Sequence, residues 1–430
     1  MKKCTVAIAG LGSRGFQAYA PCAERFPDKM EIAAVADIIP SRVEEAAARY
    51  HIPPERCFSS AEEMLRQERL ADIMFICTQD RQHVSHAIPA LKKGYHLLLE
   101  KPISPELEEC REILRAATEY NRKVVVCHVL RYTPFFEKIK RLIMEGVIGE
   151  VVSMDHIENV QYWHQAHSYV RGNWRRDDET SPMILAKCCH DTDMMLWLSG
   201  KKCKSVSSYG SCYLFREEKA PKGAALRCLD GCKAKADCPY DAEKIYVTNQ
   251  RTGIIHGNNG WPCNILADHP TEERIYQALR EGPYGRCVYH CDNNVVDHQV
   301  VNMEMEDGST LHLTMSAFNT RWGRDVTIMG TKGEIIGHME ENTITVMPFG
   351  GKKEVIDVWK LADDFSGHGG GDHRMVEELL DMVANDAPMT FQTTSLEDSM
   401  ESHFVALAAE LSRKEGGRPV DLEEIRNRRK

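Results

Sequence analysis

The first 130 residues alternate between short apolar runs and longer segments whose apolar positions recur with helical spacing. This alternation is typical of buried parallel strands joined by crossover helices. The predicted strands are Thr5–Ala9, Glu31–Ala36, Asp72–Cys77, His96–Leu99 and Lys123–Val129. The predicted helices are Ser41–Tyr50, Ser60–Gln67, His83–Lys93 and Glu106–Glu119. The pattern therefore predicts an α/β domain over residues 1–130, with a doubly wound parallel sheet of the Rossmann type.

After Gly149 the pattern changes, because apolar and polar residues now alternate as they do in a strand with one solvated face. The predicted strands here are Glu150–Glu158, Val206–Phe215, Asp297–Glu304, Ser309–Ser316, Asp325–Gly330 and Glu334–His338. Short turns with glycine join several of them, which favours a mostly antiparallel sheet. Two late helices, Arg374–Ala384 and Leu396–Arg413, complete a predicted α+β domain over residues 131–430.

Residues 217–268 interrupt the second domain. They are rich in cysteine, glycine and asparagine and show no clear period. We expect a loop-rich insertion with little hydrophobic core of its own.

Composition narrows the class of protein. The chain is 43% hydrophobic and 27% charged, which favours a folded globular protein over a disordered one. The net charge of -10, without a run of basic residues, argues against nucleic-acid binding. No apolar stretch is long enough to cross a membrane. The basic N-terminus and its short apolar run are followed by a glycine turn rather than by a cleavage site, and the 16 cysteines suggest a reducing compartment, so we expect a cytoplasmic location.

A glycine-rich turn follows the first predicted strand. In Gly10-Leu11-Gly12-Ser13-Arg14-Gly15 the three glycines allow a tight turn, close approach to a pyrophosphate and close helix packing, while the helix start at Ser13 and Arg14 offers N–H donors. Asp37 ends the second predicted strand, where a carboxylate accepts from a ribose hydroxyl and favours NAD over NADP. Arg42 leaves NADP open. The alternative is an ordinary turn, with Asp37 capping the next helix.

Several motifs resemble the Gfo/Idh/MocA family, which includes glucose–fructose oxidoreductase and inositol dehydrogenase. They are Thr78, Asp80, His83, Ala90, Leu91 and Gly94, then Glu100-Lys101-Pro102, Arg131-Tyr132-x-Pro134, Gly146-x-Ile148-Gly149-Glu150-Val151 and Gly330-x-x-Gly333. The resemblance implies that Thr78, His83 and Glu100 belong to the cofactor site. It also implies that Lys101 contacts the nicotinamide ribose and the substrate, that the Lys101–Pro102 bond is often cis, and that the protein forms a dimer or tetramer.

The segment from Ser181 to Asp193 is similar to the family helix that carries a catalytic histidine. The resemblance places His190 as the base, which should titrate near neutrality. Asp193 lies one turn further on, on the same helix face, where it could orient the His190 ring. The alternative is a core histidine paired with a neighbouring acid.

The same segment departs from inositol dehydrogenases. Those enzymes carry an acid four residues before the histidine, where this chain has Ala186, followed by Lys187. Either Lys187 enters the substrate site as a second cation, or it faces solvent or pairs with an acid. The departure leaves the substrate more open than the fold.

Other candidate site residues lie in loops. Trp174 and Arg175 are similar to a pair that some family members place near the cofactor, and Trp174 could also stack on a sugar ring. Tyr132, His298 and His368 are further candidates for substrate binding, although His373 is an alternative to the two histidines. A solvated loop without a ligand is the competing interpretation for Trp174 and Arg175.

Cysteines in the insertion have a spacing that zinc sites use. Cys228-x3-Cys232-x5-Cys238 would supply three thiolates, and we favour Cys287 over Cys263 or Cys291 as the fourth. Buried free thiols are the alternative. We expect Cys188 and Cys189 to be packing residues.

These features together predict an NAD-dependent oxidoreductase that removes hydride from a secondary hydroxyl of a sugar, cyclitol or glycoside, with NADP possible. Two alternatives remain. One is a glycosidase that oxidises a ring carbon transiently, eliminates the aglycone, adds water and reduces the ring again. The other is a non-catalytic NAD-binding sensor, which would not need both Lys101 and His190.

Overall fold

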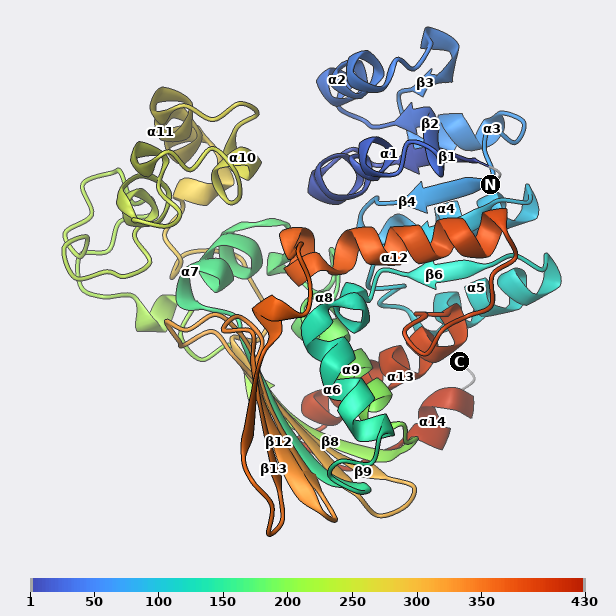
Figure 1. Ribbon diagram of the computed structural model, residues 1–430. Helices are drawn as coiled ribbons and strands as arrows, with labels where there is room; N and C mark the ends of the chain where they lie inside the picture. The colour runs from blue at the N-terminus through green and yellow to red at the C-terminus, as the bar shows by residue number, and fades with distance from the viewer. Residues whose placement is uncertain (1–2, 428–430) are drawn as a thin grey trace.

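The computed structural model describes residues 3–427, and its chain builds two sheets and a separate lobe (Figure 1). The first sheet has six parallel strands in the order β3-β2-β1-β4-β5-β6. They are β1 (Cys4–Ala9), β2 (Met30–Ala36), β3 (Cys57–Phe58), β4 (Ile73–Ile76), β5 (His96–Leu99) and β6 (Val124–Val126). This confirms the predicted doubly wound sheet. The pattern did not predict β3, because two residues show no period.

Helices cover both faces of this sheet, as its continuous apolar strands require. They are α1 (Cys22–Arg25), α2 (Pro40–Tyr50), α3 (Ala61–Arg66), α4 (His83–Lys92) and α5 (Leu107–Glu119). Between β1 and α1 the chain forms a π-helical segment, Ser13–Tyr19. The Ser60 hydroxyl caps α3 by accepting from the Glu63 N–H at 3.1 Å.

The second sheet has nine strands in the order β14-β13-β12-β11-β7-β10-β9-β8-β15. They are β7 (Val151–Asn159), β8 (Cys203–Ser211), β9 (His298–Met305), β10 (Thr310–Ser316), β11 (Gly323–Gly330), β12 (Gly333–His338), β13 (Thr343–Pro348), β14 (Glu354–Asp357) and β15 (Val420–Asp421). All pairs are antiparallel except β7 with β10, which confirms a mostly antiparallel sheet.

Helices pack against one face of the second sheet and link it to the first (Figure 1). They are α6 (Pro134–Met144), α8 (Met183–Ala186), α9 (Cys189–Ser199), α12 (Ser366–Ala384), α13 (Leu396–Lys414) and α14 (Leu422–Asn427). In α12, Met375 and Leu379 share a core with Val6 and Ile8 of β1. The late helix therefore completes the core of the first domain and ties the two domains together.

The insertion forms a lobe that extends beyond the predicted 217–268, through α10 (Cys263–Leu266) and α11 (Glu272–Glu281). The helix α7 (Tyr162–His164) and the π-helical segment Gln165–Arg171 connect the lobe to the sheet. The lobe has more core than the little that we expected, because Trp163, Tyr246, Ile275 and Leu279 belong to a third buried cluster. Residues 3–427 contain no helix long and apolar enough to cross a membrane.

Candidate active site

The glycine turn leaves open space above its backbone. Gly10 has a φ of +93°, and a Cβ there would lie 2.4 Å from the Cys77 carbonyl oxygen. A Cβ on Gly15 would lie 1.9 Å from the Gly10 oxygen, so only glycine fits at either position. A Cβ on Gly12 would have no protein atom within 4 Å. Gly12 therefore faces a free volume, as a turn that binds a pyrophosphate requires.

Asp37 lies beside this turn. Its Oδ2 accepts from the Leu11 N–H at 2.6 Å and its Oδ1 from the Ile39 N–H at 2.9 Å. Each carboxylate oxygen has a second lone pair, so the buried carboxylate can still accept from ribose hydroxyls. Arg42 lies with Nη1 4.0 Å from Asp37 Oδ2, which leaves the negative charge of Asp37 as the dominant feature for an incoming 2′-phosphate.

Lys101 follows β5 and begins a peptide bond to Pro102 that is cis in the structure. Its Nζ donates to the Ala186 carbonyl at 2.9 Å, across the boundary between the domains. Among the described residues Lys101 forms no ion pair. The preceding Glu100 is buried, accepts from the Lys101 N–H at 3.0 Å and receives Arg14 Nε at 2.7 Å. Burial opposes ionisation of Glu100, but Arg14 and Lys101 hold its pKa below the ordinary value.

His83 contacts the loop that carries Lys101 and Pro102. Its Nδ1 lies 2.7 Å from the Pro102 carbonyl and its Nε2 3.1 Å from the Thr78 carbonyl. The Thr78 hydroxyl pairs with His86 at 3.1 Å. His83 and Thr78 therefore hold the Lys101 loop in place.

His190 lies in α9, buried to 7% exposure, and its Nδ1 has no hydrogen-bond partner among the described residues. Burial, with Lys101 and then Arg324 nearby, holds the pKa of His190 well below its ordinary value. This differs from the neutral titration that we expected. The low pKa keeps the ring neutral at neutral pH. Lys101 Nζ lies one helical turn away, on the Ala186 carbonyl.

The expected pairing of Asp193 with His190 does not form. Asp193 accepts two hydrogen bonds from Arg131, at 2.7 and 2.6 Å, and lies 3.1 Å from His128 Nδ1. Although burial opposes ionisation, Arg131 and His128 lower the pKa of Asp193. Arg131 and His128 therefore take the place that we expected His190 to have beside Asp193, and the His128 ring itself lies 5.9 Å from that of His190.

Lys187 pairs with an acid, which was one of the two expectations for it. Its Nζ lies 3.1 Å from Oε1 of Glu158, and the other Glu158 oxygen lies 2.8 Å from Arg324 Nη2. Arg324 also donates to Asp191 at 2.7 Å, and Asp191 receives His156 at 2.8 Å. These buried charges lie around the start of α9 and balance one another.

Trp174 and Arg175 both have protein partners. The Trp174 indole N–H lies 3.3 Å from each Asp80 oxygen, and Ser181 also donates to Asp80 at 2.7 Å. Arg175 binds Asp292 of the lobe at 3.0 Å. Trp174 thus joins the two domains, and Arg175 joins the lobe to them.

A cleft of about 630 Å³ lies between the glycine turn and the start of α12. Ser13, Arg14 and His368 line it, together with His373. Arg14 donates to Asp372 at 2.7 Å and lies 3.2 Å from His368 Nδ1. The His368 and His190 rings are 6.3 Å apart between centroids, although His190 and Lys101 do not themselves line the cleft.

Two other predicted substrate residues lie elsewhere. Tyr132 is in the core of the first domain, where its hydroxyl donates to Glu378 at 2.7 Å. Burial, and then Glu378, raise the pKa of Tyr132 well above its ordinary value. His298 begins β9 and pairs with Asp297 at 2.9 Å. Neither residue lines the cleft.

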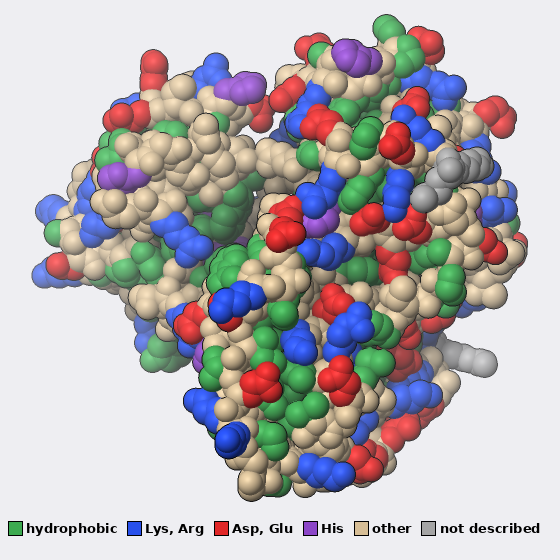
Figure 2. All heavy atoms as spheres, in the orientation of Figure 1, with side chains coloured by type: hydrophobic (Ala, Val, Ile, Leu, Met, Phe, Trp, Pro, Cys, Tyr) green, Lys and Arg blue, Asp and Glu red, His purple; other side chains and the backbone are tan. Residues whose placement is uncertain are grey.

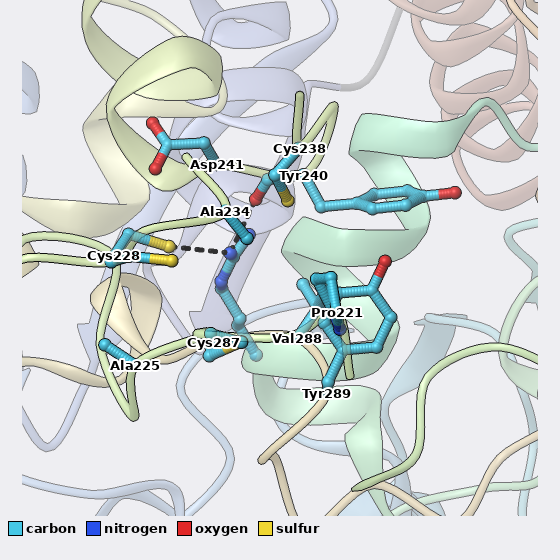
Figure 3. Close-up of a pocket in the computed structure, with 13 residues that line it drawn as sticks. Pro221, Ala225, Cys228, Ala234, Cys238, Tyr240, Asp241, Cys287, Val288 and Tyr289 are labelled. Atoms are coloured by element: carbon cyan, nitrogen blue, oxygen red, sulfur yellow. Dashed lines mark hydrogen bonds between the residues drawn. The ribbon is translucent and has the colours of Figure 1, made fainter. Parts of the chain in front are cut away.

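The predicted cysteines meet, but not as a metal centre. Cys228, Cys232, Cys238 and Cys287 line one small pocket in the lobe (Figure 3). Over residues 3–427 no three His, Cys, Asp or Glu side chains are arranged to hold a metal ion. The zinc prediction is not supported. The buried Arg171 explains this, because its guanidinium donates to Cys228 Sγ at 3.6 Å and repels a second cation. Burial also raises the pKa of Cys238 and Cys287.

Sequence reasoning missed several charged residues of the site. Glu158, Asp191, Arg324 and Asp372 come from four separate segments, and only the fold brings them to His190 and Lys101. Only Asp191 could have been found from the sequence, because it directly follows His190.

Both domains of the chain match the models of one protein family. Residues 4–128 match the model described as the NAD-binding Rossmann fold of an oxidoreductase family, and residues 140–422 match its C-terminal alpha/beta domain. The chain belongs to the Gfo/Idh/MocA oxidoreductase family. The Gfo/Idh/MocA matches span both domains and leave out only the junction between them and the two ends.

Relatives in the Gfo/Idh/MocA family differ in how much of the chain they match. YteT of Bacillus subtilis, provisionally named an oxidoreductase, is 26% identical and covers 87% of this chain and 88% of its own. Inositol 2-dehydrogenase of Corynebacterium glutamicum is 25% identical over 52% of this chain and 60% of its own. Glycosyl hydrolase family 109 protein 1 of Bacteroides fragilis is 27% identical over 40% of this chain and 38% of its own.

A solved structure confirms the fold. The inositol dehydrogenase homolog of Azotobacter vinelandii, complexed with NAD+, superposes with a TM-score of 0.69 at 16% identity, over 98% of this chain and 97% of its own.

Proposed function

We propose that this chain oxidises a secondary hydroxyl of a sugar, cyclitol or glycoside with NAD as the hydride acceptor. The single observation that carries the proposal is the hydrogen bond of 2.9 Å from Lys101 Nζ to the Ala186 carbonyl, one helical turn before the buried His190, whose Nδ1 has no partner among the described residues. A base that takes a hydroxyl proton must be unprotonated before the reaction, and a cation nearby makes the hydroxyl more acidic. Membership of an NAD-binding oxidoreductase family is consistent with this chemistry.

The chain offers a site that fits NAD. The open space above Gly12 and the N–H groups of the following helix suit a pyrophosphate, and the Asp37 carboxylate suits a ribose diol. The helical segment that follows the turn begins with Ser13, Arg14 and Gly15. The loop of Lys101 is held by Thr78, His83 and Glu100. When bound, NAD accepts the hydride that leaves the carbon atom. A negative Asp37 disfavours the 2′-phosphate of NADP, which makes NAD the proposed cofactor and NADP the weaker one.

The residues of the chain then have separate roles. Lys101 contacts the hydroxyl oxygen of the substrate and stabilises negative charge on it, while a ring nitrogen of His190 accepts the proton. His368 lines the approach to His190. Asp193 is a positioning residue, because its bonds to Arg131 fix α9, which carries His190, and do not reach the His190 ring.

The relatives favour carbohydrate chemistry, since one is named for inositol and another for glycoside hydrolysis. The family 109 relative, together with Ala186 in place of an acid, also supports a second candidate: glycoside cleavage that recycles NAD. A dehydrogenase accumulates NADH, whereas the glycosidase releases aglycone only when NAD is present and accumulates none. The two products are measured in one assay.

The test of the first proposal is His190→Ala, which should abolish turnover while NAD affinity changes less than about threefold. If the protein were a non-catalytic NAD-binding sensor, His190→Ala would leave its response to NAD unchanged. We also keep the prediction of a homo-oligomer, which the uncovered outer face of the nine-stranded sheet supports, with Val152 and Ile157 exposed on it.

A further inference from the structure

Trp261 lies in the lobe next to the cofactor domain and is not used by the proposed chemistry. It directly precedes α10, whose Asn264 donates to Gln17 at 3.1 Å. Gln17 belongs to the helical segment after the glycine turn and lines the cleft. Figure 2 shows the hollow between the lobe and the rest of the molecule. The lobe therefore reaches across to the first domain at the level of Trp261.

The Trp261 ring is firmly held and yet exposed. Its centroid lies 4.8 Å from those of Trp163 and His164 and 5.5 Å from that of His167. His167 is itself fixed by Tyr246 at 2.9 Å and by stacking on Tyr284. Despite these contacts, 40% of Trp261 remains exposed. A rigid indole with a free face is suited to binding the C–H face of a sugar ring at a low entropic cost.

His164 of α7 lies directly beside Trp261. Its Nδ1 is buried and makes no hydrogen bond of ordinary geometry with the described residues. Burial holds the pKa of His164 well below its ordinary value, and Lys187 and Lys101 act in the same direction, while the Val160 carbonyl opposes them. The ring is thus neutral, and it lies 5.8 Å between centroids from Tyr169, which lies 6.4 Å from Trp174 at the junction of the two domains. A neutral imidazole offers one donor and one acceptor, which suits a sugar hydroxyl.

We infer that Trp261 and His164 form a second sugar-binding subsite, which holds the non-reacting ring of a disaccharide or glycoside whose other ring lies at Lys101 and His190. The inference rests on the proposed function for the location of the reacting ring. Geometry supports it, because Trp261 contacts His164, and Asn264, three residues after Trp261, binds Gln17 of the cleft. His368 lines the same cleft, and its ring lies 6.3 Å from that of His190. The subsite selects substrates larger than a monosaccharide.

The experiment measures binding and turnover separately. Cellobiose, maltose and lactose, with glucose and galactose as the matching monosaccharides, are titrated into the NAD-loaded protein by calorimetry, and NADH formation is followed in parallel. The variants are Trp261→Ala, Trp261→Phe and His164→Phe, which keeps a ring and removes the nitrogens. Phe349→Ala is the control, since Phe349 is a 69% exposed aromatic residue in the turn after β13.

We expect at least one disaccharide to bind more tightly than its monosaccharide. Trp261→Ala should weaken this disaccharide about tenfold or more and the monosaccharide less than about twofold. Trp261→Phe should retain most of the affinity, His164→Phe should lose a part of it, and Phe349→Ala should lose none. If Trp261→Ala fails to fold, Trp261→Phe and His164→Phe are compared with the wild type instead.

Equal losses for both sugar sizes, unchanged disaccharide binding in Trp261→Ala and His164→Phe, or no disaccharide binding by the wild type would each overturn the inference. Binding that depends on Trp261 without any NADH would overturn the proposed function and leave the subsite standing. NADH formation from sugars that does not change in the Trp261 variants would overturn the subsite and leave the proposed function standing.

Discussion

The Nζ atom of Lys101 donates a hydrogen bond of 2.9 Å to the carbonyl oxygen of Ala186, one turn before His190. Lys101 belongs to the first domain and Ala186 ends α8 of the second, so this bond sets the position of the cation relative to the base. The acid that inositol dehydrogenases carry at the Ala186 position is absent, and here the backbone itself receives the lysine.

Replacement of Lys101 tests its role in the reaction. Lys101→Met removes the cation with little change in length, and we expect kcat to fall about a hundredfold or more while NAD affinity stays within about threefold. Steady-state kinetics and calorimetric titration of NAD measure the two quantities. Lys101→Arg is the matched control and should retain more activity. Wild-type kcat in Lys101→Met would contradict the assignment.

Asp37 should determine the preference for NAD. Asp37→Ala removes an acceptor for ribose and for the Leu11 N–H, which should weaken NAD by about 1.5–3 kcal/mol, or roughly 10- to 100-fold. NADP should weaken less, because its 2′-phosphate no longer meets a carboxylate. Calorimetry with both cofactors measures the ratio. A ratio of NAD to NADP affinity that does not change would show that Asp37 does not face the ribose.

The buried pair of Arg131 and Asp193 should support stability rather than chemistry. Arg131→Met leaves the Asp193 carboxylate buried beside His128 alone, so we expect a loss of about 3–5 kcal/mol in the free energy of unfolding. The double variant Arg131→Met with Asp193→Leu should recover a large part of it. Urea unfolding measures both. A single variant as stable as the wild type would show that the pair contributes nothing.

The pH dependence of this pair has a defined sign. The pKa of Asp193 is lower in the folded state than in the unfolded chain, so its contribution is present above the unfolded value of about 4 and disappears as the pH falls through the folded value. The difference in unfolding free energy between the wild type and Asp193→Asn should therefore be constant from about pH 6 to 8 and shrink below about pH 4. A difference that grows on acidification would contradict the ion pair.

His190 makes a second prediction for pH. Because its pKa is held well below the ordinary value of 6.5, the neutral and active form persists at mildly acidic pH. The acid limb of the kcat/KM profile should therefore fall below pH 6.5 and be absent from His190→Gln after correction for its lower rate. An acid limb that lies above the ordinary value and depends on His190 would contradict the burial of its ring.

The sequence predicted the parts of the fold that depend on local periodicity. Continuous apolar strands such as Ile73–Ile76 and the glycine turn at Gly10 were visible, because each needs only its own residues. The short strand β3 was not, and α12 could not be assigned to the first domain, since its Met375 meets Val6 only in the fold.

The site was predictable where a motif carries it. Lys101 and His190 were chosen through motifs, and their roles stay predictions; the fold brings them together through the bond of Lys101 to Ala186, one turn before His190. The partner of Asp193 was missed, because Arg131 lies 62 residues away in the sequence. The cysteine spacing suggested zinc, but spacing does not reveal the guanidinium of Arg171, which comes from another segment and lies among the thiols. Trp261 and His164 were missed for the same reason.

We propose that Lys101 and His190 together perform the NAD-dependent oxidation of a carbohydrate hydroxyl. The most direct measurement follows NADH absorbance and aglycone release together, over a panel of sugars, cyclitols and aryl glycosides, with the wild type and His190→Ala. The wild type should form NADH from at least one substrate, and His190→Ala should form NADH from none. Absence of NADH from every substrate, including aglycone release without NADH, or wild-type turnover by His190→Ala, would contradict this role.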